Sequence, residues 1–108
     1  MLTAIVNGNG KRNKAGIETL YLHFNKKLSS SLPDKVGRKV PIQIVLGGVT
    51  YSGILGSRSD YSYIYVSTQL VDPDGTKRKL ADVLKHCGIS KGDRLSVKVR
   101  GNHLTVIG

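Results

Sequence analysis

Short stretches in which apolar and polar residues alternate, separated by turn-forming residues, run through most of this chain. Residues 20–24 read LYLHF and residues 94–100 read RLSVKVR. A period of two places alternate side chains on opposite faces of an extended strand. Gly47-Gly48 and the segment 72–75, which reads DPDG, are typical of tight turns between such strands. The pattern therefore predicts a mainly β fold.

The apolar segments predict about seven strands and two short helices. The strands are expected near residues 2–6, 20–24, 40–46, 49–55, 63–71, 94–100 and 103–107, and the helices near 26–32 and 80–87. Because closure hides sheet edges, many short strands in a chain of 108 residues favour a closed or partly closed barrel. We expect a single domain over residues 1–108. Its predicted architecture is an open pseudobarrel of about seven strands with two short α-helices.

One helix and one cysteine can be placed more closely. Four residues of the second helix share one apolar stripe: Leu80, Val83, Leu84 and Cys87. Cys87 is therefore expected in the core, and Gly88 is expected to end the helix. As the single cysteine, Cys87 also excludes an internal disulfide and a multi-cysteine zinc site within the chain.

The sequence offers no convincing catalytic cluster. The three histidines lack the spacing of metal ligands. Asp72 and Asp74 could hold magnesium beside Lys77, as in a nuclease, but the three residues lie in one turn rather than on paired strands. We expect no catalytic residue, no metal, no cofactor and no small-molecule substrate.

The charge balance narrows the choice of partner. Seventeen Lys and Arg residues face seven Asp and Glu residues, for a net charge of +10 and a pI near 10.0. Such an excess indicates a polyanionic partner, with nucleic acid first and an anionic membrane second. No segment has the roughly 20 apolar residues of a membrane span, and the N-terminus does not resemble a signal peptide. We expect a cytoplasmic protein that binds no membrane; the alternative is a solvated basic surface without a partner.

A basic loop near the N-terminus is the first candidate DNA contact. Residues 8–14 read GNGKRNK. Arginine pairs with guanine and asparagine with adenine in the major groove, and glycine allows close approach of the backbone. The candidate contact residues are Lys11, Arg12, Asn13 and Lys14. The alternative is a flexible charged loop.

A polar loop in the middle of the chain is the second candidate. Residues 57–62 read SRSDYS, in which Arg58 could read guanine and Asp60 could accept a hydrogen bond from cytosine. Alternatively, Asp60 orients Arg58, or the loop is a solvated hairpin tip. Two further basic groups could follow a phosphate backbone or be ordinary solvated surface: residues 77–79, and Arg94, Lys98 and Arg100.

Four tyrosines near the polar loop admit two interpretations. Tyr51, Tyr61, Tyr63 and Tyr65 could stack on unpaired bases, as in proteins that bind single strands. Packing on a sheet face is favoured for Tyr51 and Tyr65, and both interpretations stay open for the other two.

The order of the predicted elements resembles a known family. Residues 20–55, from LYLHF to YSGIL, resemble the strand, helix, G-K-x-V turn and hairpin of the plant B-three transcription-factor domains. Residues 63–108 resemble the closing helix, the G-L-x-x-G-D turn and the final hairpin of that family. The same pseudobarrel forms the recognition domain of restriction endonucleases of the EcoRII and BfiI kind, and the DPDG turn with its following helix is closer to this bacterial branch.

The resemblance implies a pseudobarrel that grips duplex DNA in the major groove with two arms. The arms correspond to residues 8–14, extending to Gly16, and residues 57–62. By resemblance, contact roles fall to Lys11, Arg12, Asn13 and Lys14 in the first arm, to Arg58, Ser59, Asp60 and Tyr61 in the second, and to Arg38 and Lys39 as phosphate contacts.

We therefore expect sequence-specific binding of double-stranded DNA by the target-recognition domain of a bacterial restriction endonuclease. The chain would be no enzyme by itself, and a nuclease domain or subunit would be its partner. Two alternatives stand beside this expectation. One is a small barrel that binds single-stranded nucleic acid, and the other is a conserved bacterial barrel with a small-molecule or protein role.

Overall fold

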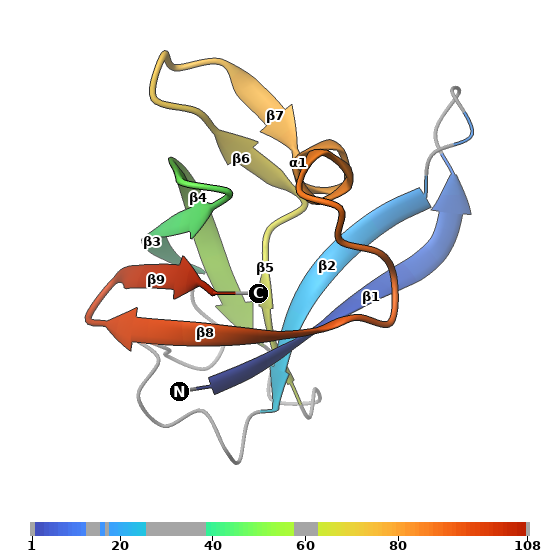
Figure 1. Cartoon of the computed structure of the whole chain (residues 1–108), viewed down its shortest axis with the longest axis horizontal. Helices are drawn as coiled ribbons and strands as arrows, with labels where there is room; N and C mark the ends of the chain where they lie inside the picture. Colours follow the sequence, from blue (N-terminus) through green and yellow to red (C-terminus); the bar gives the residue numbers. More distant parts are fainter. Residues whose placement is uncertain (1, 13–15, 17, 26–38, 58–62, 108) are drawn as a thin grey trace.

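The computed structural model describes residues 2–12, 16, 18–25, 39–57 and 63–107 (Figure 1). Within these residues lie nine strands and one helix. They are β1 (Leu2–Arg12), β2 (Glu18–Asn25), β3 (Lys39–Leu46), β4 (Val49–Ser57), β5 (Tyr63–Val66), β6 (Gln69–Val71), β7 (Lys77–Lys79), α1 (Leu80–His86), β8 (Arg94–Arg100) and β9 (His103–Val106). The first predicted helix, at 26–32, lies outside the described residues.

Seven of the strands form a closed barrel. Their order is β3-β9-β8-β1-β2-β5-β4, and the pairing of β3 with β4 closes the ring. All eight residues of β3 pair with β4 across the Gly47-Gly48 turn, while three of them also pair with β9 in parallel. The prediction of a mainly β barrel is confirmed, but the prediction of an open one is wrong. The long β3–β4 hairpin satisfies both edges that an open barrel would leave unpaired.

The barrel interior is an apolar core built from the inward positions of each strand. It includes Ala4, Val6, Leu22, Phe24, Ile42, Ile44, Leu46, Leu55, Ile64, Val66, Leu95, Val97 and Leu104. In β8, Leu95 and Val97 point inward. Their neighbours Arg94, Ser96 and Lys98 are exposed, as the alternation predicts. The core therefore fixes which side chains of each strand face solvent.

The helix α1 packs against β2 and contributes Leu80, Val83 and Leu84 to the core. Cys87 is exposed, so its predicted core position is wrong. The helix ends at His86, and Cys87 caps it with non-helical backbone angles. Gly88 then adopts a φ of +71°, and the amide of Ile89 donates to the Leu84 carbonyl at 2.9 Å, as in a glycine-terminated helix.

The first hairpin is longer than predicted. β1 extends to Arg12 and β2 begins at Glu18, so residues 7–12 are strand rather than loop. Asn7 and Gly8 pair with β2, and the register then shifts before Arg12 pairs with Glu18. Glycine and asparagine predict a loop locally, but the neighbouring strand supplies hydrogen-bond partners that keep the chain extended.

The predicted strand over residues 63–71 is divided into β5 and β6. Ser67 and Thr68 separate them: the Ser67 amide donates to the Ile54 carbonyl at 2.8 Å, and the Ser67 Oγ donates to the Gln69 carbonyl at 2.9 Å. β5 stays in the barrel wall, whereas β6 leaves it to form a hairpin with β7 (Figure 1). Residues 77–79, singled out above as a basic group, form this short strand.

Candidate nucleic-acid interface

Most residues predicted to contact DNA fall outside what can be described. Asn13, Lys14, Arg38, Arg58, Ser59, Asp60 and Tyr61 lie outside the described residues. Lys11 and Arg12 end the strand β1, rather than lying in a loop. Lys39 begins β3 and its side chain is exposed. Between Arg12 on β1 and Lys39 on β3, the barrel contains β2, β5 and β4.

The two predicted arms are attached at opposite ends of one face of the barrel. The first joins β1 to β2 beyond the pairing of Arg12 with Glu18. The second joins β4 to β5, and Tyr63 at its end pairs with Asn25 at the other end of β2. Glu18 and Asn25 are seven positions apart in β2, which corresponds to about 23 Å of extended strand. The outer face of β1, β2, β5 and β4 lies between the two attachment points.

One row of directly paired, outward positions crosses this face. Its members, here called the barrel row, are Arg94 on β8, Ile5 on β1, His23 on β2, Tyr65 on β5, Gly56 on β4 and Lys39 on β3. Neighbouring strands are about 4.8 Å apart, so each member adjoins the next. The row thus has a cation at each end and aromatic rings in its middle.

Four aromatic side chains form a continuous cluster around the middle of the row. This aromatic face consists of Tyr21, His23, Tyr63 and Tyr65, all half-buried. The rings of His23 and Tyr63 are stacked, with centroids 4.1 Å apart and planes inclined by 17°. Tyr21 meets His23 at 5.6 Å and Tyr65 edge-on at 6.4 Å. The stacking and edge contacts hold the rings in a defined arrangement on the outside of the barrel.

Gly56 allows Tyr65 to lie flat across β4. A Cβ atom at position 56 would come within 2.6 Å of the Cζ and hydroxyl oxygen of Tyr65. Every other residue type would therefore displace this ring. The glycine accounts for the place of Tyr65 in the aromatic face.

The charged residues of this face lie at the two ends of the barrel row. Burial lowers the pKa of His23 below its usual value, which keeps its imidazole neutral at pH 7. Arg94 and Lys39 are exposed, and neither forms an ion pair with any residue that the structure describes. Two exposed cations thus lie on either side of the aromatic rings.

An ion pair links Glu18, at the start of β2, to the connection between α1 and β8. Lys91 Nζ, in the connection between α1 and β8, lies 2.9 Å from Glu18 Oε2. That oxygen is buried and has no hydrogen-bond partner among the described residues, so the contact is electrostatic. The Glu18 carboxylate occupies the space that a side chain at position 8 would need, so any residue larger than glycine there would displace it. Lys91 is therefore engaged within the protein.

The DPDG turn serves a structural purpose. Asp72 Oδ1 accepts hydrogen bonds from the amides of Asp74 at 3.0 Å and Thr76 at 2.8 Å, and its Oδ2 accepts from Arg78 Nε at 3.0 Å. The Thr76 amide is the largest cause of the lowered pKa of Asp72. With both oxygens occupied, Asp72 is poorly placed to bind magnesium. Within the described residues, no group of three His, Cys, Asp or Glu side chains could hold a metal.

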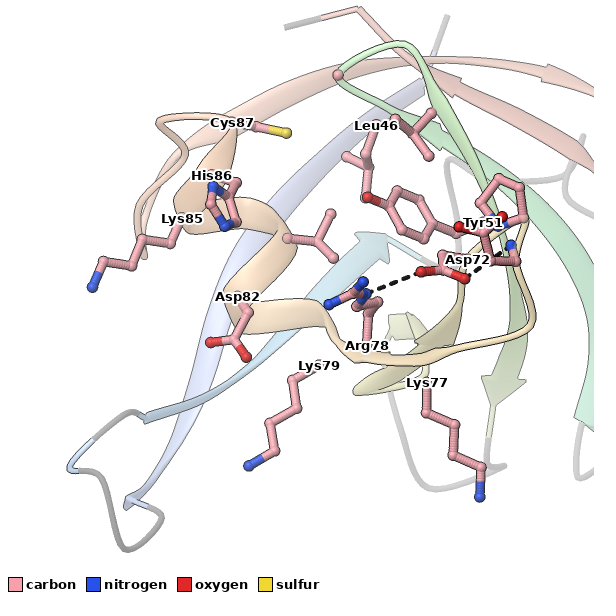
Figure 2. Close-up of a pocket in the computed structure, with 15 residues that line it drawn as sticks. Leu46, Tyr51, Asp72, Lys77, Arg78, Lys79, Asp82, Lys85, His86 and Cys87 are labelled. Atoms are coloured by element: carbon pink, nitrogen blue, oxygen red, sulfur yellow. Dashed lines mark hydrogen bonds and ion pairs between the residues drawn. The ribbon is translucent and has the colours of Figure 1, made fainter.

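A hollow of about 1310 Å³ separates the β6–β7 hairpin and α1 from the β3–β4 turn (Figure 2). Its floor includes Leu46, Tyr51 and Val83, and Tyr51 packs against the core as predicted. The charges that line it are mixed: Lys77, Arg78, Lys79 and Lys85 against Asp72, Asp74 and Asp82. Because these charges nearly cancel, the hollow attracts an anionic partner less strongly than the barrel row does.

Ile5, Tyr21 and His23 carry no motif, and sequence reasoning does not single them out. The available signal was the alternation in residues 20–24, which places two aromatic residues outward between three core residues. Their proximity to Tyr63 and Tyr65 depends on the pairing of β2 with β5, which no local pattern specifies.

No protein-family model, no curated protein and no solved structure matches this chain. The likeness to the B-three domains therefore rests on the short sequence patterns. Among the described residues, no helix has the length and apolar character required to cross a membrane.

Proposed function

We propose that this chain is a sequence-specific binder of duplex DNA that serves as the recognition domain of a bacterial restriction endonuclease. In this proposal the two segments predicted as arms enter the major groove, and the face between them contacts the backbone. The chain carries no catalytic residue of its own, and a separate nuclease domain or subunit cuts the DNA.

The observation that carries the proposal is the position of the arm attachments relative to the barrel row. They lie about 23 Å apart along β2, a span that can bracket a major groove about 12 Å wide. Arg94 and Lys39 flank the face between them and can neutralise phosphates. The net charge of +10 adds long-range attraction toward DNA.

Binding of single-stranded nucleic acid is a second candidate, favoured by the aromatic face. Bases of a single strand stack on exposed rings, at about 1–3 kcal/mol for each base. The ordered pair of His23 and Tyr63 is the specific observation in its favour, since the bases of an intact duplex cannot stack on it.

Selection of duplexes from a random pool, followed by anisotropy titrations, tests the main proposal. We expect a preferred duplex, with an affinity that falls linearly with salt on logarithmic axes. The Arg12→Ala variant should weaken binding to that duplex by about 1–3 kcal/mol if Arg12 reads a base. If no duplex is preferred at moderate salt, sequence specificity is wrong.

Competition with the matched single strand separates the two candidates. Tyr63→Leu keeps an apolar side chain on β5 but removes the ring. Under the main proposal this change leaves duplex affinity nearly intact, whereas under the second candidate single-strand affinity falls by about 1–3 kcal/mol. Absence of binding to either form at low salt would contradict both.

Charge-matched variants test the barrel row itself. Arg94→Gln and Lys39→Gln should each reduce the salt slope by about 1. Lys85→Gln is the control, because Lys85 is equally exposed but lies on α1, away from the row. Equal losses in all three variants would show a general effect of charge and not a contact at this face.

A further inference from the structure

A second row of paired positions crosses the barrel on the strands that the aromatic face leaves out. This polar row consists of Arg100 on β8, His103 on β9, Gln43 on β3 and Ser52 on β4. Each residue is directly opposite the next, and adjacent strands are about 4.8 Å apart. Four different hydrogen-bonding side chains are thus placed side by side.

The polar row lines a groove of about 430 Å³, which Pro41 and Asn102 also line. Small-ligand sites begin at roughly 300 Å³, so the groove has room for a compact ligand. None of its lining residues is acidic. Arg100 is exposed and forms no ion pair with any described residue. Lys98, two residues earlier on the same outward face of β8, is likewise unpaired among those residues and adds positive potential.

The backbone of the groove is held firmly. The carbonyl of Asn102, in the β8–β9 turn, accepts a hydrogen bond from the Gln43 amide at 2.8 Å. The side-chain amide of Asn102 donates to the Pro41 carbonyl at 3.1 Å. These bonds attach the turn to β3, so Arg100 and His103 keep their register with Gln43. The fixed backbone positions from which the four side chains extend reduce the conformational freedom lost when an anion binds.

We propose that the polar row is a second binding site, for a phosphate group, separate from the aromatic face. The guanidinium of Arg100 supplies charge and two parallel donors, which suit phosphate oxygens. The Gln43 amide, the Ser52 hydroxyl and a ring nitrogen of His103 complete the contacts. The phosphate is either that of a free phosphorylated ligand or a diester in a nucleic-acid backbone.

Titration of the ¹⁵N-labelled chain with inorganic phosphate, and separately with dimethyl phosphate, tests the site. We expect saturable shifts in the signals of Gln43, Ser52 and His103. Arg100→Gln should weaken this binding by about tenfold, because a hydrogen bond to a charged group is lost. Lys85→Gln, the matched charge control on α1, should bind like the wild type.

Ser52→Asp provides a second, independent variant, since a carboxylate in the groove repels the anion while the exposed position tolerates the change. Preference for inorganic phosphate supports a free ligand, and preference for dimethyl phosphate supports a nucleic-acid backbone. The proposal is overturned if neither anion shifts these signals, if Arg100→Gln and Ser52→Asp bind both anions like the wild type, or if Lys85→Gln loses as much affinity as Arg100→Gln. Because the barrel row is untouched, these outcomes do not depend on duplex binding there.

Discussion

The ring of Tyr65 lies across Gly56, its partner in the β4–β5 pairing, so closely that a Cβ atom at position 56 would approach its hydroxyl oxygen to 2.6 Å. The missing side chain on one strand thereby creates the seat for an aromatic ring on the next. Tyr65 in turn supports Tyr21 through an edge contact at 6.4 Å. The geometry of the aromatic face thus depends on a residue that contributes no atom to its surface.

Gly56→Ala is expected to change the aromatic face more than the stability of the barrel. The new methyl group would tilt the outer end of the half-buried Tyr65 ring, and alanine is the better strand residue. The free energy of unfolding should change by no more than about 1 kcal/mol. Ring-proton shifts of Tyr65 and Tyr21 should change clearly. A large loss of stability with unchanged ring shifts would contradict this account.

Gly8→Ala is expected to destabilise the first hairpin by displacing the Glu18 carboxylate from its place beside Lys91. A loss of about 1–3 kcal/mol follows from disturbing a largely buried charge. A double-mutant cycle provides the measurement. In the Glu18→Ala background the same Gly8→Ala change should cost much less, because the clash is gone. Additive losses would show that the two residues do not interact.

Leu84→Ala is expected to cost about 2–5 kcal/mol, because Leu84 is fully buried where α1 packs against the barrel. Denaturant unfolding measures the loss. Ile107→Ala is the matched control, since Ile107 is 56% exposed and its truncation should cost no more than about 0.5 kcal/mol. Similar losses for the two variants would contradict the burial of α1.

His23 is expected to make the folded state less stable in mildly acidic solution. Burial lowers its folded pKa, so between the unfolded value of 6.5 and the lower folded value the unfolded chain binds more protons. The contribution of neutral His23 is complete above pH 6.5 and is lost as the pH falls toward the folded pKa. Urea unfolding of the wild type and His23→Gln across this range should show a smaller pH dependence for the variant. Parallel curves would indicate that His23 titrates normally.

The features that depend on the local pattern of apolar residues were predictable from the sequence. The alternation in residues 94–100, the Gly47-Gly48 and DPDG turns, and the apolar stripe of α1 each follow from short-range rules. The same rules were wrong for Cys87, whose position depends on where the helix ends. They were also wrong for residues 7–12, where a neighbouring strand outweighs the local preference for a loop.

The candidate sites were less predictable, because they are made by strand pairing. Lys39, His23 and Arg94 are far apart in the chain and carry no common motif. Their alignment in one row follows from five separate strand pairings, and a shift of one residue in any of them would turn side chains to the opposite face. The polar row depends on such pairings in the same way.

The sequence by itself determined that this chain is basic and mainly β, with turns at defined places. These properties follow from the composition of the chain and from the alternation of apolar and polar residues, a pattern that extends over only a few residues at a time. Closure of the barrel, the contact between Tyr65 and Gly56, and the two rows were decided by the tertiary structure. Pairing between strands distant in sequence sets those features, because the register that buries one face of each strand also fixes which residues meet on the other.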